Sequence, residues 1–241
     1  MSLRAPQFVE RMTALCSPEE QAKLKRYFRT GAGDYGEGDI FVGVRMGQLF
    51  DLAKEFIEMP PQEIEKLLES PIHEARAGGV SIMDKQARSQ KTPAERRKEL
   101  YDLYMRRMDR INSWDLVDLG APHVVGGYLF DKPRDVLYRL ARSRNMWERR
   151  TAIVSTLFFV RKGEVEDTFA IAELLLQEPE DLVQKATGGL LREAGKKDAK
   201  RLRAILDRHA ATMPRTLLRY AIERLDTVER ERYLYAKKRA R

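Results

Sequence analysis

A tryptophan and an aspartate in the stretch INSWDLVDLG form the clearest chemical pairing in the sequence. Trp114 and Asp118 are four residues apart, so in a helix they lie on one face. Asn112 or Ser113 can cap that helix. An indole can hold a planar cation, and a carboxylate beside it can stabilise positive charge or orient a water molecule. The alternative is a core tryptophan with Asp115 or Asp118 paired to a nearby arginine.

A second stretch, RSRNMWERRTAIVST, places two arginines in the first turns of an otherwise apolar helix. Asn145 can cap this helix, and Arg149 and Arg150 follow Trp147 by two and three residues. An arginine that enters so apolar a helix needs an anionic partner, either Asp118 or a phosphate. A buried arginine–aspartate pair with a structural role is the alternative interpretation.

The stretch GAGDYG, residues 31–36, matches the letters of a dinucleotide-binding turn. That motif requires a preceding β-strand and a following helix. The preceding SPEEQAKLKRYFRT instead predicts a helix, with Ser17 and Glu20 spaced as a capping box. The residues after the glycines also have a helical period. We therefore interpret residues 31–44 as a glycine-rich connection between helices and the match as coincidental.

The rest of the chain predicts helix after helix, with Pro and Gly at the breaks. The predicted pairs begin near residues 61, 95, 133, 165 and 198. Their spacing of roughly 32 to 38 residues is close to that of helical-repeat arrays, which expose a concave binding surface. We expect an all-α, curved α-solenoid, with an irregular helical bundle as the alternative.

Composition limits the classes of function. The chain has 241 residues, 43% of them hydrophobic, which is typical of a globular protein. Its formal net charge of +8 suggests a polyanionic partner, most simply nucleic acid, and a basic protein that is merely soluble is the alternative. Its single cysteine, Cys16, excludes an internal disulfide, and His73, His123 and His209 lack metal-ligand spacing. We expect structural roles for these histidines, and neither metal nor cofactor. No signal peptide or membrane-spanning run is evident, so a cytoplasmic protein without membrane association is expected.

Basic residues concentrate in residues 85–110, in residues 132–150 and in the C-terminal RERYLYAKKRAR. In a solenoid these stretches could line one groove and neutralise phosphates, which would make binding sensitive to salt. For any one of the stretches, a solvated helix face is the alternative.

Several stretches, at the right mutual spacing, resemble the AlkD-type DNA alkylation repair family: GEGDIFVGVR, NSWDLVDL, ARSRNMWERRTAIVST, KATGGLLREAGKKD and MPRTLLRYAIER. The resemblance runs from about residue 20 to 235. It implies one HEAT-like repeat domain over residues 1–241, an ARM/HEAT-like superhelix with a basic concave groove. N-terminal helices over 1–30 and a glycine-rich loop over 31–44 would precede stacked repeats over 45–241.

The resemblance also implies an activity. The family's enzymes are DNA glycosylases that hydrolyse the N-glycosidic bond of cationic N3- or N7-alkylated purines in duplex DNA, without conventional base flipping. Its catalytic aspartate falls on Asp118, its cation-binding tryptophan on Trp114, and the arginine that holds the lesion's backbone on Arg150. We expect a monofunctional enzyme, because the pattern contains no obvious lysine nucleophile. The expected state is a monomer without an obligate protein partner, associated with the nucleoid when bound to DNA.

One position departs from the family pattern. Gly189 stands where family members usually carry a second tryptophan that frames the lesion. Activity could therefore be reduced, and a non-catalytic relative that binds damaged or unusual DNA is an alternative. A helical scaffold for a protein partner is a third hypothesis, which expects no basic concave face. The further DNA-binding residues that we expect are Tyr27, Arg149, Lys185, Arg192, Arg215 and Arg219.

Overall fold

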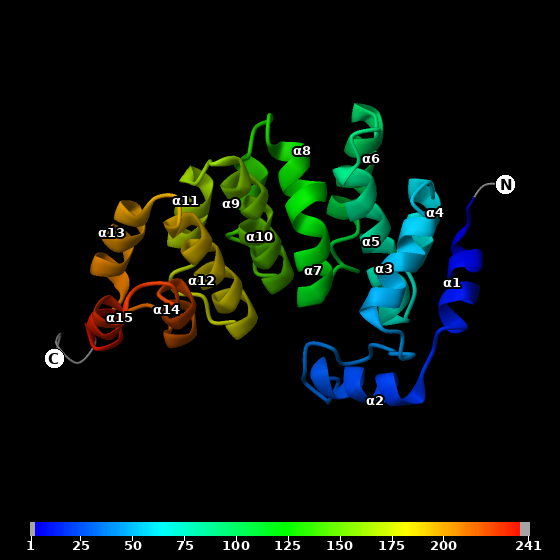
Figure 1. The fold of residues 1–241 in the computed structure, drawn as a ribbon, viewed down its shortest axis with the longest axis horizontal. Coiled ribbons are helices and arrows are strands. Elements are labelled where there is room, and N and C mark those ends of the chain that lie inside the picture. Colours follow the sequence, from blue (N-terminus) through cyan, green and yellow to red (C-terminus); the bar gives the residue numbers. More distant parts are fainter. Residues whose placement is uncertain (1–2, 237–241) are drawn as a thin grey trace. The chain divides into compact units, whose positions relative to one another are not determined.

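The computed structural model describes residues 3–236, and within them the secondary structure is helical, without a strand (Figure 1). An isolated bridge joins Ile40 to Ile72. The prediction of an all-α protein is confirmed. The elements in chain order are α1 (Ala5–Thr13), α2 (Pro18–Tyr27), α3 (Met46–Glu55), α4 (Pro61–Leu68), α5 (His73–Arg88), α6 (Ala94–Arg106), α7 (Trp114–Gly120), η1 (Ala121–Gly126), α8 (Gly127–Leu129), α9 (Asp135–Leu140), α10 (Met146–Lys162), α11 (Glu166–Leu174), α12 (Asp181–Gly195), α13 (Ala199–His209), α14 (Arg215–Ala221) and α15 (Thr227–Leu234).

The repeated helix pairs begin close to the predicted positions. Their first helices start at Pro61, Ala94, Asp135, Glu166 and Ala199. The second helices of successive pairs pack against one another, α5 on α7, and then α10 on α12 and α12 on α14. This contact pattern is that of stacked helical repeats, in which each pair buries its apolar face against its neighbours.

The chain divides into two compact units after Tyr128. Each unit has its own buried core, which includes Phe8 and Leu67 in the first and Phe159 and Leu191 in the second. The single-domain organisation and the concave groove remain predictions.

Helix boundaries follow the punctuation in the sequence. The Ser17 hydroxyl accepts a hydrogen bond from the Glu20 backbone N–H at 3.5 Å, as the first half of the predicted capping box requires. The Asn145 side chain accepts from the Trp147 backbone N–H at 2.8 Å and caps α10, as predicted. Gly163, with φ of +94°, ends the same helix in the left-handed conformation that glycine adopts readily. The residues STLFFVRKG thus belong to α10 and not to a strand.

A π-helical turn surrounds Pro122. Residues 121–126 form η1 between α7 and α8, so the helical path continues through the proline. A proline lacks the N–H that an α-helix would use, and a wider turn accommodates that loss. The chain thus stays helical from residue 114 to residue 129, with a changed hydrogen-bond pattern after the proline.

The C-terminal end of the glycine-rich segment is anchored to the first turn of α5. The buried Glu74 carboxylate accepts hydrogen bonds from the backbone N–H groups of Val42, Gly43 and Val44, at 3.0, 2.8 and 3.3 Å. Gly43 has φ of +89°, and a Cβ there would lie 2.1 Å from the Ser17 carbonyl oxygen. Only glycine fits this position, because both the backbone conformation and the close approach exclude a side chain. The segment follows α2 directly, so no strand precedes the glycines, as the sequence predicted.

Candidate functional site

Trp114 is the first residue of α7 and lies among aromatic rings from the end of α2. The Phe28 ring stacks on the indole, with ring centroids 5.7 Å apart and 16° between the planes. The Tyr27 ring meets the indole edge-on at 5.8 Å. Tyr27 is 66% exposed, so its outer side faces solvent. The structure thus brings together two of the residues predicted from the sequence, Tyr27 and Trp114.

The indole N–H is also fixed. It donates a hydrogen bond to the hydroxyl of Tyr35 at 3.1 Å. Burial raises the pKa of the Tyr35 phenol, and this outweighs the opposing effect of the Trp114 hydrogen bond. Tyr35 belongs to the GAGDYG stretch, and sequence reasoning missed it. The contact spans 79 residues, a separation that no local pattern reveals.

Asp118 is exposed and lies on α7, one helical turn after Trp114. The shared helix confirms that the two residues belong to one helical face, as their spacing predicted. Phe28 lies against one face of the indole, so a planar cation would have to stack on the opposite face. This pairing of a held indole with an exposed carboxylate can bind a cationic ring and stabilise positive charge beside it.

A buried network lies behind the tryptophan. The imidazole of His73 is 1% exposed, with Nε2 2.8 Å from a carboxylate oxygen of Asp115 and Nδ1 3.3 Å from one of Asp39. Arg76 donates a hydrogen bond to the other Asp39 oxygen at 2.6 Å. The hydroxyl of Ser113, the residue at the N-cap of α7, donates to Asp115 at 2.6 Å instead of capping the helix. Asp115 is thus paired with a histidine, where the sequence suggested an arginine.

The network keeps His73 charged. Burial disfavours the imidazolium, but the carboxylates of Asp115 and Asp39 outweigh it and raise the pKa of His73 to about 9. Burial likewise opposes ionisation of Asp39, yet His73 and Arg76 hold the pKa of that carboxyl below its usual range. At neutral pH a buried imidazolium therefore lies between Asp115 and Asp39. The predicted structural role of His73 is confirmed, and His123 contacts Asp84 at 2.8 Å in a similar way.

The two arginines at the start of α10 belong to the second unit. Arg150 is 6% exposed and donates a hydrogen bond to the Leu182 carbonyl. Arg149 forms a bidentate ion pair with the buried Glu178, at 2.7 and 2.6 Å, and donates to the Ser143 carbonyl. The partner of Arg149 is thus a carboxylate of its own unit, and a DNA contact would have to compete with this pair.

Two predicted DNA-binding residues lie on α12 and have anionic neighbours. Lys185 pairs with Asp181 one turn earlier, at 2.6 Å. Arg192 pairs with Glu223. These side chains are partly exposed, and exposed ion pairs contribute about 0–1 kcal/mol. Exchange of these carboxylates for phosphates would therefore cost little.

The other two predicted cations lie on α14, which packs against α12. Arg215 donates to the Leu234 carbonyl at 2.8 Å. Arg219, one turn later, is exposed and has no ion pair with another residue in the described range 3–236. Two neighbouring helices thus carry four of the predicted DNA contacts.

The two glycines of α12 differ in what surrounds them. A Cβ on Gly188 would lie 2.4 Å from the Leu217 carbonyl oxygen and 2.6 Å from the Tyr220 Cβ. A Cβ on Gly189 would have no neighbour within 4 Å. Gly188 therefore permits the close approach of α12 to α14, whereas Gly189 leaves open space where the resemblance implies a tryptophan.

Part of the basic surplus in residues 85–110 serves the fold. Arg97 donates to the main-chain carbonyls of Ala87 and Ser89, each at 2.6 Å. Arg110 donates to the carbonyl of Ser70 at 3.0 Å. These two side chains are thus bound to the main chain, a role that neither the groove nor the solvated helix face predicted. In the C-terminal basic stretch, residues 237–241 lie outside the described residues.

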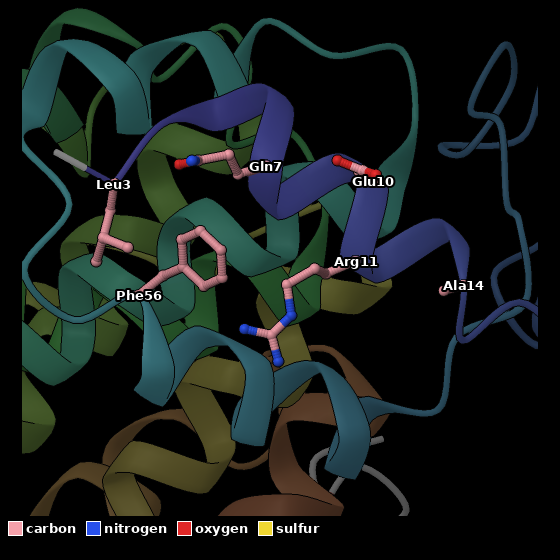
Figure 2. Close-up of a pocket in the computed structure, with 6 residues that line it drawn as sticks. All are labelled: Leu3, Gln7, Glu10, Arg11, Ala14 and Phe56. Atoms are coloured by element: carbon pink, nitrogen blue, oxygen red, sulfur yellow. The ribbon is translucent and has the colours of Figure 1, made fainter. Parts of the chain in front are cut away.

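A separate hollow lies between α1 and the end of α3 (Figure 2). Figure 2 shows the Arg11 guanidinium facing the Phe56 ring, 5.7 Å from its centroid, and Arg11 also pairs with Glu55 at 2.7 Å. No residue predicted to act on DNA lines this hollow. Its lining consists of Leu3, Gln7, Glu10, Arg11, Ala14 and Phe56.

No cluster of three or more His, Cys, Asp or Glu side chains within residues 3–236 could hold a metal ion. Over the same residues, every helix is too short or too polar to cross a membrane.

Comparisons with known proteins agree with the fold. A family model described as DNA alkylation repair enzyme matches residues 8–225. No curated protein matches the sequence. The solved structure of a predicted DNA alkylation repair enzyme from Enterococcus faecalis is similar, with a TM-score of 0.67 and 18% identity, over 88% of this chain and 97% of that one. At that identity the likeness shows the helical-repeat fold alone, whereas the family model covers most of the sequence. The chain therefore belongs to the DNA alkylation repair enzyme family.

Proposed function

We propose that this protein is a monofunctional DNA glycosylase that hydrolyses the N-glycosidic bond of cationic N3- and N7-alkylated purines in duplex DNA. The observation that carries the proposal is the arrangement on α7. Trp114 is held by Phe28 and Tyr35, and Asp118 is exposed one turn later on the same helix.

Trp114 would recognise the lesion by its charge. Alkylation at N3 or N7 gives the purine a positive charge, and an indole is the aromatic side chain best suited to a cation. Because the ring is already fixed by stacking and by its hydrogen bond to Tyr35, little conformational entropy would be lost on binding. An undamaged, neutral purine would gain little from the same contact, which gives selectivity.

Asp118 would act at the sugar. The alkylated purine leaves with the electron pair of the glycosidic bond and becomes neutral, so it needs no acid. Positive charge then develops on the sugar as an oxocarbenium ion, which a nearby carboxylate stabilises. A water molecule oriented by Asp118 adds to C1′, and its proton passes to the carboxylate or to solvent. Hydrolysis by water leaves the DNA strand intact.

The duplex would be held by the cations of α12 and α14. Lys185, Arg192, Arg215 and Arg219 are partly or fully exposed, and only weak surface pairs would need to be exchanged for phosphates. Arg149 is the weakest of the proposed contacts, because its buried pair with Glu178 would be lost. Tyr27 would contact the DNA beside Trp114, and Arg150 would hold the backbone at the lesion. The protein would act as a monomer without cofactor, on DNA in the cytoplasm.

Base release from methylated duplex DNA tests this proposal. Free 7-methylguanine and 3-methyladenine would be measured for the wild type and for Asp118→Asn, Trp114→Ala and the control Asp131→Asn, an exposed aspartate. Loss of the carboxylate is expected to lower the rate by about 100-fold or more. Loss of the indole is expected to lower it by about tenfold or more. The control should keep full activity, and full activity in the first two variants would contradict the mechanism.

Gly189 favours a second candidate, a relative that binds damaged or unusual DNA without catalysis. Open space surrounds this position, where the resemblance implies a tryptophan that frames the lesion. Salt-dependent binding of DNA by the wild type with no release of either base would support this candidate and refute the glycosylase.

A further inference from the structure

We propose that Tyr35 and His73 are positioning residues that hold Trp114 in place, and that the glycine-rich loop of residues 31–44 is therefore part of the functional site. Tyr35 fixes the rotation of the indole, and His73 ties the start of α7 to the loop through Asp115 and Asp39. The catalytic meaning of this proposal depends on the proposed function, but the positioning itself does not.

The loop is shaped to deliver Tyr35 to the tryptophan. Gly33 and Gly38 flank Tyr35 and have φ of +80° and +82°, values that favour glycine. Gly36 lies close to the end of α2, where a Cβ would meet the Phe28 carbonyl oxygen at 3.0 Å. The glycines thus let the chain turn tightly back on Phe28, the residue that also stacks on the indole. The glycines therefore shape an aromatic clamp, in which Phe28 and Tyr35 hold Trp114, and this accounts for their spacing without a nucleotide.

His73 connects the same loop to α7. Its two ring nitrogens face two carboxylates, Asp115 on α7 and Asp39 in the loop, and Asp115 is the residue next to Trp114. The imidazolium can donate to both carboxylates at once, whereas the neutral ring has a single N–H donor. The protonated form therefore bridges loop and helix, and the neutral form can hold only one of them.

Three charged side chains surround His73. The titratable and charged groups that face it are Asp115 from α7, Asp39 from the loop and Arg76 from its own helix, α5. The Phe28 ring lies 4.8 Å from the imidazole and 5.7 Å from the indole. Displacement of His73 would thus reach Trp114 by two routes, through Asp115 and through Phe28.

A single-tryptophan protein reports on the clamp without any DNA. The chain has two tryptophans, so Trp147→Phe leaves Trp114 as the sole tryptophan, which excitation near the red edge of the indole band selects over the tyrosines. In this background Tyr35→Phe removes the acceptor of the indole hydrogen bond and keeps the aromatic ring. The net free energy of one hydrogen bond corresponds to about a threefold to tenfold change in the ratio of fixed to displaced indole. Relative to the single-tryptophan parent, we expect this variant to show lower fluorescence anisotropy of Trp114. Because the displaced indole is more accessible, acrylamide quenching should rise by about twofold or more.

The matched control is Tyr101→Phe, which removes a tyrosine hydroxyl elsewhere in the same unit, where the ring stacks on Tyr128. It should leave both signals unchanged. Equal anisotropy and quenching in Tyr35→Phe and the control would overturn the role of Tyr35.

A pH titration of the same signals tests His73. Its pKa of about 9 predicts that quenching of Trp114 rises as the pH passes about 9. The raised pKa of Tyr35 lies above its ordinary value of 10.0, which keeps that phenol protonated through this step. In His73→Gln the step should be absent, and quenching should be high at every pH. A step of unchanged size in His73→Gln would overturn the role of His73.

Activity is a separate measurement. If the proposed glycosylase activity exists, Tyr35→Phe should lower kcat by about tenfold through misplacement of the indole, with KM for DNA unchanged. An unchanged kcat together with altered quenching would refute the catalytic meaning of the clamp. If the wild type releases no base, the proposed function fails, and the fluorescence results still decide whether Tyr35 and His73 position Trp114.

Discussion

Two adjacent glycines on α12 should respond in opposite directions to the same substitution. Gly188→Ala would place a Cβ 2.4 Å from a backbone oxygen and 2.6 Å from another Cβ, both on α14. Gly189→Ala would place a Cβ in open space. Both positions are in a regular helix, so the intrinsic helical preference for alanine is the same for each.

The magnitudes follow from these contacts. Alanine in place of glycine within a helix gains about 0.5–1 kcal/mol, and Gly189→Ala should show most of this gain. At Gly188 the gain is opposed by overpacking, which costs about 1–3 kcal/mol or more. The upper part of that range applies, because the Leu217 carbonyl belongs to the backbone of α14 and cannot move away like a flexible side chain. We expect the two variants to differ by about 2–3 kcal/mol in the free energy of unfolding.

Urea unfolding followed by Trp147 fluorescence measures this difference in the unit that contains α12. A Trp114→Phe background removes the signal of the other unit, since the chain has only two tryptophans. With a slope of about 2 kcal/mol per molar urea, the midpoints should differ by about 1 M or more, with Gly189→Ala above the parent and Gly188→Ala below it. Equal midpoints, or a stabilised Gly188→Ala, would refute the conclusion that Gly188 is required for the close packing of α12 on α14.

Three further outcomes are expected. The free energy of unfolding should fall by up to about 3 kcal/mol as the pH rises from about 6.5 through 9, because the His73 imidazolium stabilises the fold only while it is protonated. Urea midpoints measured across this range test it, and a pH-independent midpoint would contradict it. Glu74→Gln should lower the free energy of unfolding by about 2 kcal/mol, because the carboxylate that accepts three backbone N–H groups is lost. The exposed control Glu58→Gln should change it very little, and equal urea midpoints for the two variants would contradict this role. Arg149→Lys should lower stability by about 1–2 kcal/mol by breaking the bidentate pair with Glu178; an unchanged urea midpoint would contradict this role of the guanidinium.

The helices were predictable because their signals are local. Pro61, Asn145 and Gly163 stand at helix ends where their backbone preferences place them, and the pairing of helices followed from the intervals between such breaks. The placement of Trp114 and Asp118 on one helical face is also local, since four residues make about one turn. The flanks of GAGDYG sufficed to reject a dinucleotide-binding turn.

The contacts that hold the site were not predictable from the sequence. Tyr35 reaches Trp114 across 79 residues, and His73 reaches Asp115 across 42. Side chains so far apart meet only after α2, α5 and α7 have packed, and no periodicity records which pairs will touch. The same reason applies to the glycines of α12. In the sequence Gly188 and Gly189 are alike, and only the position of α14 decides that one is required for packing and the other leaves space. The sequence alone thus determined the helices and the residues capable of chemistry, whereas tertiary packing decided which side chains hold them in position.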